Sequence, residues 1–147
     1  MSVIGGLSIS PTRRRLRLFL RWHVNANVTQ TEVIQFLRQL LRHLRGNVIV
    51  IWDRLNAHRG RQTKIFVNSC KRLSIELLPP YAPELNPIEG VWANVKYHRM
   101  PNHGIHDVAE LHQRACDATS QVADEPMLLR SFVAATGLPL RMPMVVH

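Results

Sequence analysis

A segment that is apolar at every position limits this chain more than any other feature. Residues 47–53 read NVIVIWD, and everything between Asn47 and Asp53 is apolar. A strand of this kind is typical of parallel sheets that are covered by helices on both faces. The sequence therefore predicts a central, parallel strand that is buried on both faces.

Strand and helix patterns alternate along the rest of the chain. Period-two alternation predicts strands, and apolar residues three and four apart predict amphipathic helices. The order predicts an α/β domain with helices against a mixed sheet, and no linker divides residues 1–147, so we expect one domain. The expected elements are strands at 2–10, 13–24, 47–53 and 73–78, helices at 29–47 and 61–70, a helix that starts after Asn86, a further helix opened by Asp107 and Glu110, a short helix at 127–137 and a loosely held tail at 138–147.

The helix at 29–47 and the strand at 13–24 carry the clearest patterns. Thr29 and Glu32 form a T-x-x-E capping box. In the strand, leucines alternate with a row of arginines that is either a solvated face or a strip that contacts phosphate. The apolar stripe of the helix consists of Val33, Phe36, Leu37, Leu40, Leu41 and Leu44, and the arginine row of the strand of Arg15, Arg17 and Arg21.

Charge and cysteine usage indicate the kind of partner and the compartment. Lys and Arg number 19 against 10 Asp and Glu, which gives a net charge of +9 and favours a polyanion, nucleic acid first. Cys70 and Cys116 form no CxxC pair and are expected to be buried thiols in a reducing compartment. No apolar run reaches the length of a membrane span and no signal-peptide pattern is present, so we expect a cytoplasmic protein.

Asp53 stands where the apolar strand ends. Ligands of open α/β sheets bind at the carboxyl ends of strands, so Asp53 is a candidate site residue. The alternative is that Asp53 caps the following loop, 54–60, or pairs with Arg54 or Arg59.

Glu89 stands just inside a helix that follows a proline-rich loop. Residues 78–92 read LPPYAPELNPIEGVW, in which Asn86 can cap the helix and Pro87 takes its first position. Glu89 then occupies the place of a capping-box acid, but the positive helix end also favours an ionised carboxylate of the kind that Mg²⁺ or Mn²⁺ requires. The prolines would hold the acid at a fixed distance from the sheet. The buried stripe is expected to be Ile88, Val91, Trp92 and Val95.

Two segments together resemble a known family. VIVIWDRLNAHRG (48–60) followed by LPPYAPELNPIEGVWANVK (78–96) is similar to the catalytic domain of mariner-type transposases, and most similar to their bacterial insertion-sequence relatives. The second segment matches P-x-Y-x-P-x-L-N-P-I-E-x-x-W-x-x-x-K in register, and the likeness covers residues 3–99.

The resemblance implies a ribonuclease H-like fold and a DDE active site, in which three carboxylates hold two Mg²⁺ (or Mn²⁺) ions for DNA cleavage and strand transfer. Asp53 would be the second acid and Glu89 the third, both catalytic and metal-binding, with their carboxylates on the order of 4–8 Å apart. Asn86 and Pro87 would shape the turn that presents Glu89.

The resemblance also implies DNA as the partner, both transposon ends and target. His58 would lie near the metal loop, and Lys96 follows Glu89 by about two helical turns and would face the same side. The residues expected to contact DNA are Lys96, Arg59, His58 and Arg54.

The match departs from the family at its beginning. The family's first Asp belongs to a strand upstream of the one that residues 2–10 match, and Glu32 is the only acid before Asp53. We therefore expect the C-terminal part of a transposase, inactive alone, which would need an upstream transposase fragment or act as a homodimer near the bacterial nucleoid. The alternatives are a non-catalytic DNA-binding relic or regulator, and a stand-alone nuclease whose third acid is Asp107 or Asp117.

Overall fold

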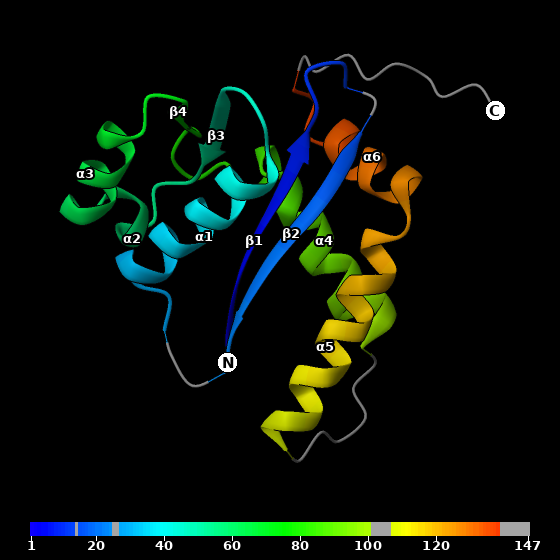
Figure 1. The fold of residues 1–147 in the computed structure, drawn as a ribbon. Coiled ribbons are helices and arrows are strands. Elements are labelled where there is room, and N and C mark those ends of the chain that lie inside the picture. The colour runs from blue at the N-terminus through cyan, green and yellow to red at the C-terminus, as the bar shows by residue number, and fades with distance from the viewer. Residues whose placement is uncertain (14, 25–26, 101–106, 139–147) are drawn as a thin grey trace. The chain divides into compact units, whose positions relative to one another are not determined.

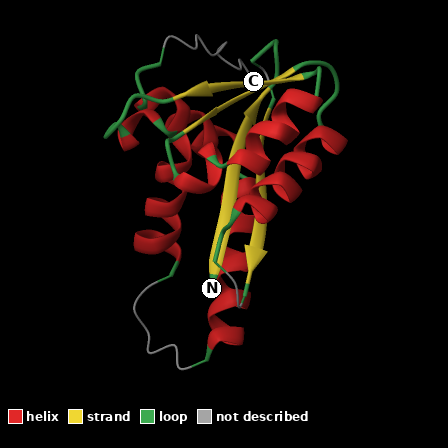
Figure 2. Ribbon diagram, turned by 90° about the vertical axis from the view of Figure 1, so that its left-hand side faces the viewer, coloured by secondary structure: helices red, strands yellow, loops and turns green. Residues whose placement is uncertain are grey.

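The computed structural model describes residues 1–13, 15–24, 27–100 and 107–138 (Figure 1). Residues 139–147 of the expected tail lie outside this range. The elements follow the expected order, and Figure 2 shows them by type. They are β1 (Ser2–Ile9), β2 (Leu16–His23), α1 (Gln30–His43), β3 (Val48–Trp52), α2 (Asn56–Arg59), α3 (Arg61–Ser69), β4 (Leu73–Leu77), the 3₁₀ turn η1 (Pro83–Leu85), α4 (Pro87–Asn94), the π-helical turn η2 (Val95–Arg99), α5 (Val108–Ala123) and α6 (Pro126–Ala135).

The chain forms two compact units, which we describe one by one. The central unit consists of Ser2–Ile4 and Arg21–Pro83, and the C-terminal unit of Met1, Gly5–Leu20 and Glu84–His147. The described strands form two sheets of two strands each, β1 with β2 and β3 with β4, in place of the one mixed sheet expected from the sequence. In each sheet the two strands are consecutive in the chain, joined by a turn in the first sheet and by the α2–α3 segment in the second.

The hairpin of β1 and β2 confirms the predicted alternation in part. Leu16 and Leu18 pack against the core of the C-terminal unit, and Arg15 and Arg17 are exposed. Arg21 is half-buried instead of solvated, because its guanidinium donates to Gln35 Oε1 at 2.6 Å.

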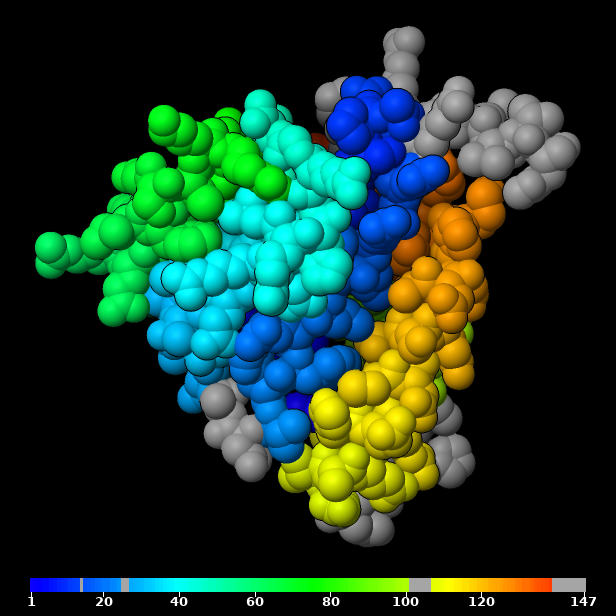
Figure 3. Space-filling view, viewed as in Figure 1, coloured from blue at the N-terminus to red at the C-terminus, as the bar shows by residue number. Residues whose placement is uncertain are grey.

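Helix α1 supplies the core of the central unit. The predicted capping box is present: the Thr29 backbone N–H donates to Glu32 Oε2 at 2.9 Å, and the Thr29 hydroxyl accepts from the backbone at the start of the helix. Arg72 holds the other end, since its guanidinium donates to the carbonyls of Leu41 and Leu44. The buried residues of α1 are Val33, Phe36, Leu37 and Leu40. The side of the helix opposite to them lies at the surface in Figure 3, drawn in light blue to cyan.

Strand β3 corrects the prediction made for residues 47–53. It pairs in parallel with β4, as expected, with Val48 opposite Leu73 and Trp52 opposite Leu77. Only one face is covered, however: Val48 is buried, whereas Ile49 is 67% and Ile51 51% exposed. Within the described residues β3 has one neighbouring strand, so this unit leaves part of the strand's apolar surface uncovered.

The core of the C-terminal unit lies among α4, η2, α5 and α6. Trp92 packs against it, as predicted, whereas Val108 at the start of α5 is 49% exposed. Arg99 ties the helices together, with hydrogen bonds to Asn94 and Gln121 and an ion pair with Glu125 at 2.5 Å. The buried cluster consists of Ile88, Val91, Val95, Ala118, Val122 and Leu129.

Two glycines of this unit allow close packing. A Cβ at Gly5 would lie 2.6 Å from Cζ2 of Trp92, and one at Gly90 would lie 2.7 Å from Cδ1 of Phe132. Both separations are far inside van der Waals contact, so only glycine fits there without a shift of the neighbouring ring. Gly90 thereby lets α6 approach the first turn of α4.

The cysteines are less buried than predicted. Cys70 and Cys116 are both free and half-buried. Burial raises the pKa of the Cys116 thiol, and the charge of Asp117 adds to the shift, so the neutral thiol is favoured. Among the helices of the described ranges, none has the length and apolar character that a bilayer crossing requires.

Candidate active site

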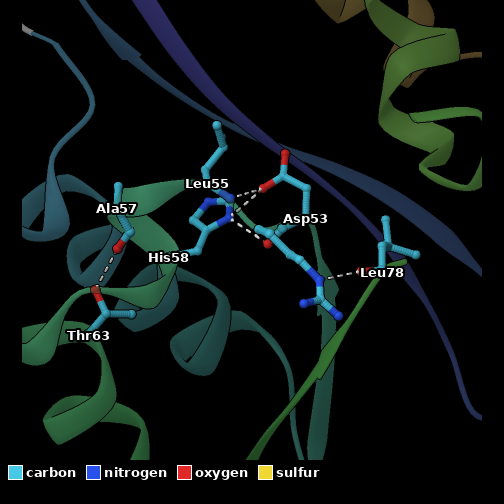
Figure 4. A network of polar contacts seen from close by, with 7 residues as sticks. Asp53, Leu55, Ala57, His58, Thr63 and Leu78 are labelled. Carbon is cyan, nitrogen blue, oxygen red and sulfur yellow. Dashed lines mark hydrogen bonds and ion pairs between the residues drawn. The ribbon is translucent and has the colours of Figure 1, made fainter. Parts of the chain in front are cut away.

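Asp53 lies directly after β3 in the central unit, and its two carboxylate oxygens have different surroundings (Figure 4). Oδ1 accepts a hydrogen bond from the backbone N–H of Leu55 at 3.1 Å and lies 2.8 Å from Nδ1 of His58. The Asp53 side chain is 44% exposed. Within the described residues Oδ2 takes part in neither contact, so one oxygen is held by the protein and the other is available.

His58 comes from the short helix α2 and is held on two sides. Its ring stacks on that of Trp52, with centroids 4.5 Å apart and planes 6° from parallel. Its Nδ1 also lies 3.4 Å from the backbone carbonyl of Asp53. Both neighbours of Nδ1 are oxygens that can only accept, so Nδ1 carries a hydrogen whether the ring is neutral or cationic.

Helix α2 explains why His58 reaches Asp53, and the sequence did not predict it. Residues 54–60 were expected to form a loop, but Asn56–Arg59 make one helical turn. Thr63, fully buried in α3, fixes that turn by donating its hydroxyl hydrogen to the carbonyl of Ala57 at 2.9 Å (Figure 4). The turn brings His58 back over Asp53.

The arginines predicted as partners of Asp53 lie elsewhere. Arg54 directs its Nε to the carbonyl of Leu78, at 3.3 Å, and Arg59 is exposed. The predicted capping of the loop is confirmed by the Leu55 hydrogen bond, but the side chain that contacts the Asp53 carboxylate is His58 and not an arginine. Arg54 is also exposed and borders the start of the proline-rich loop, whereas His58, 14% exposed, offers little surface for DNA.

Glu89 lies in the first turn of α4, in the C-terminal unit. Asn86 caps the helix by accepting from the N–H of Ile88 at 3.4 Å, and Pro87 takes the first position, as predicted. The reciprocal bond of a capping box is not formed: the Glu89 carboxylate is exposed and makes no hydrogen bond or ion pair with a described residue. The carboxylate is therefore free to take a ligand.

Lys96 lies in the π-helical turn η2, one residue after it begins. Its ammonium is exposed and sits over the ring of Tyr97, 5.1 Å from the centroid. Because the π-helical turn begins one residue before Lys96, most of the segment from Glu89 to Lys96 belongs to α4, and the prediction that both face the same side stays a prediction.

The acids named as alternative third ligands have structural roles. Asp107 caps α5 by accepting from the N–H of Ala109 at 3.1 Å, and Asp117 accepts from Gln113 at 3.0 Å on the exposed side of the same helix. Both observations disfavour the stand-alone nuclease.

Asp53 and Glu89 are each suited to bind a metal ion as a single carboxylate ligand. Mg²⁺ and Mn²⁺ prefer carboxylate oxygens, and Asp53 and Glu89 each offer at least one, so each fits as a single ligand. No group of three or more His, Cys, Asp or Glu side chains in the described ranges could hold a metal ion. The acids belong to different units, and their separation stays a prediction.

Comparison with known proteins gives the family. The model of the DDE superfamily endonuclease family matches residues 9–112, which include Asp53, His58, Glu89 and Lys96. An uncharacterized protein of Sinorhizobium fredii (strain NBRC 101917 / NGR234), y4pE/y4sA, is 27% identical over 86 residues, which are 58% of this chain and 61% of that protein. The chain thus spans about three fifths of the length of this curated relative, and no solved structure matches it. Because the family model covers well over half of the sequence, the chain belongs to the DDE superfamily endonucleases.

Proposed function

We propose that the chain is the C-terminal part of a DDE transposase catalytic domain, of the mariner-type and bacterial insertion-sequence kind, with a ribonuclease H-like fold. The observation that carries the proposal is that Asp53 and Glu89, each at the end of an element, both keep a carboxylate oxygen without a partner among the residues that the structure describes. Both acids stand where a ligand can reach them, Asp53 directly after β3 and Glu89 in the first turn of α4.

Asp53 and Glu89 would supply two of the three carboxylates of the metal site. When bound, a pair of divalent ions supplies the positive charge that activates the attacking hydroxyl and stabilises the leaving oxygen at a DNA phosphate. Asp53 would present Oδ2 and Glu89 either oxygen, and the third carboxylate would come from a strand of another segment. The chain alone would therefore bind ions weakly and remain inactive.

The surface of the central unit would hold the DNA. This unit contains ten Lys and Arg residues against three acids, whereas the C-terminal unit contains nine against seven. Exposed arginines lie on α1 and around α2, and Arg54 and Arg59 flank the Asp53 loop. Guanidinium groups bind phosphate in a bidentate way, so this charge would place the DNA backbone beside Asp53.

A cleavage assay tests the catalytic part of the proposal. Supercoiled plasmid is incubated with the purified chain in Mg²⁺ or Mn²⁺, and we expect no nicking, because loss of one ligand leaves transition-state charge uncompensated and costs orders of magnitude in rate. Addition of an upstream segment that carries a strand with an Asp should restore cleavage, and Asp53→Ala or Glu89→Ala should abolish the restored activity. Nicking by the chain alone that both substitutions remove would show that the third ligand is internal.

The second candidate function is a non-catalytic DNA-binding protein of a transposon, favoured by the charge of the central unit. It predicts the same binding of DNA but no cleavage after the upstream segment is added. The plasmid assay therefore separates the two functions.

A further inference from the structure

The Asp53 loop contains a contact that the sequence alone does not reveal, the stack of His58 on Trp52. The stack is nearly parallel, at 6°, and the Nε1 hydrogen of Trp52 is buried without a hydrogen-bond partner among the described residues. A buried donor that is left unpaired is costly. Among the described residues, the indole therefore contacts the imidazole through its face and makes no hydrogen bond of its own.

His58 in turn determines which oxygen of Asp53 is available. Oδ1 has two lone pairs, and two donors occupy it, the Leu55 N–H at 3.1 Å and His58 Nδ1 at 2.8 Å. Rotation of the carboxylate would break both contacts. Oδ2 consequently keeps both lone pairs and points away from the loop backbone, as the two oxygens of Asp53 show in Figure 4.

We propose that His58, clamped by Trp52, is a positioning residue that fixes the Asp53 carboxylate so that a divalent cation is bound through Oδ2 alone. The proposal rests on the proposed function, because it assumes that Asp53 is a metal ligand. The backbone bond from Leu55 is of the kind that an Asp makes when it caps a loop, and the His58 contact and the ring stack restrain this loop further. Partners of this kind orient metal-ligating side chains and typically change metal affinity tenfold or more when removed.

The variants separate the hydrogen bond from the stack. His58→Asn keeps a donor near the position of Nδ1, and His58→Phe keeps an aromatic ring but has no donor. Trp52→Phe keeps the stack and removes the unpaired buried N–H, and Trp52→Leu removes the stack. His43→Phe is the matched control, because His43 is an exposed histidine of the same unit on the last turn of α1.

Two measurements on the full chain test the proposal. Without metal, nitrogen NMR of the imidazole should show hydrogen on Nδ1 of His58 in the wild type and in Trp52→Phe. With Mn²⁺ at millimolar concentration, paramagnetic broadening of the Asp53 carboxyl carbon measures even weak binding. We expect His58→Phe and Trp52→Leu to weaken Mn²⁺ binding about tenfold, His58→Asn to recover most of it, and Trp52→Phe and His43→Phe to leave it unchanged.

The outcomes distinguish this proposal from the function on which it rests. Loss of Mn²⁺ binding in Asp53→Asn, together with unchanged binding in His58→Phe, would overturn the role of His58 and keep Asp53 as a ligand. Binding that is unaffected by Asp53→Asn, or no broadening of the Asp53 signal at all, would overturn both. Hydrogen on Nε2 in place of Nδ1 of His58 would overturn the positioning role without any metal. Equal weakening in His58→Asn and His58→Phe, with folding intact by circular dichroism, would also count against it.

Discussion

Tyr81 has a backbone conformation that tyrosine rarely adopts. Its φ is 58°, in the left-handed region, and its side chain is fully exposed in the proline-rich loop. The left-handed region costs an L-residue roughly 1–2 kcal/mol, and no buried contact of the ring offsets it. We predict that Tyr81→Gly raises the free energy of unfolding by about 1 kcal/mol, after the entropy that glycine loses on folding is subtracted.

Urea unfolding of Tyr81→Gly and Tyr81→Ala measures this effect. Alanine keeps the Cβ, so Tyr81→Ala should leave the strain in place and change the midpoint little. If both substitutions lower the free energy of unfolding, the tyrosine ring makes a stabilising contact and the strain is not the dominant contribution.

Single residues also show how far sequence reasoning reaches. Asn86 and Pro87 were predicted as cap and first residue of α4, because both signals are local. For Glu89 the sequence does not choose between a capping-box acid and a metal ligand, since spacing alone does not decide whether the side chain turns back to the cap. His58 was missed as the partner of Asp53: the arginines beside Asp53 are stronger cations, and the contact depends on a helical turn and a ring stack.

Helix α1 should show a pH dependence of stability that comes from Glu32. The Thr29 hydroxyl and then the Thr29 N–H, both of which donate to the carboxylate, lower the pKa of Glu32 from its ordinary value of 4.5. A carboxyl group with a lowered folded-state pKa stabilises the protein above the unfolded-state pKa, and that stabilisation is lost as the pH falls through the folded-state value. The wild type should therefore lose stability in acid relative to Glu32→Gln.

Urea midpoints of the two proteins from neutral pH to below 4 check this prediction. Gln can still accept from Thr29 but does not ionise, so the difference between the midpoints should shrink as the pH falls. A difference that is constant over the range would show that Glu32 does not act through its charge.

At the level of elements, the boundaries of most helices and strands were predictable and the burial of β3 was not. The capping box and the apolar stripe of α1 both depend on residues of the helix and its N-cap, so they can be recognised locally. The exposure of Ile49 and Ile51 depends on which other elements cover β3, and the residues of the strand itself do not specify those neighbours.

The uneven charge of the molecule predicts which part contributes most to DNA affinity. Replacement of Arg42, Arg45 and Arg61 by alanine in the central unit should weaken binding to all sequences alike. It should lower the slope of log affinity against log salt by about 0.9 for each phosphate that the variant no longer neutralises. Arg114→Ala is the matched control, because Arg114 is already paired with Glu110 at 2.6 Å and belongs to the C-terminal unit.

Fluorescence anisotropy with a labelled duplex over a range of salt concentrations measures the slopes. An equal loss of affinity in Arg114→Ala, a binding curve that is flat in salt, or strict preference for one sequence would contradict a binding mode that depends on phosphate charge.

The close contact at Gly90 has a consequence for how a gene of this kind decays. Every missense change of a glycine codon adds at least a Cβ, and at Gly90 that atom would meet the ring of Phe132. We expect a substitution there to shift Phe132, and through it the packing of α6 against the turn of α4 that carries Glu89. If the chain has the function proposed above, a drifting copy would lose the geometry of its acid through a neighbouring codon while the Glu89 codon stays intact, and an undamaged pair of acidic codons would be no evidence that the copy can still be mobilised.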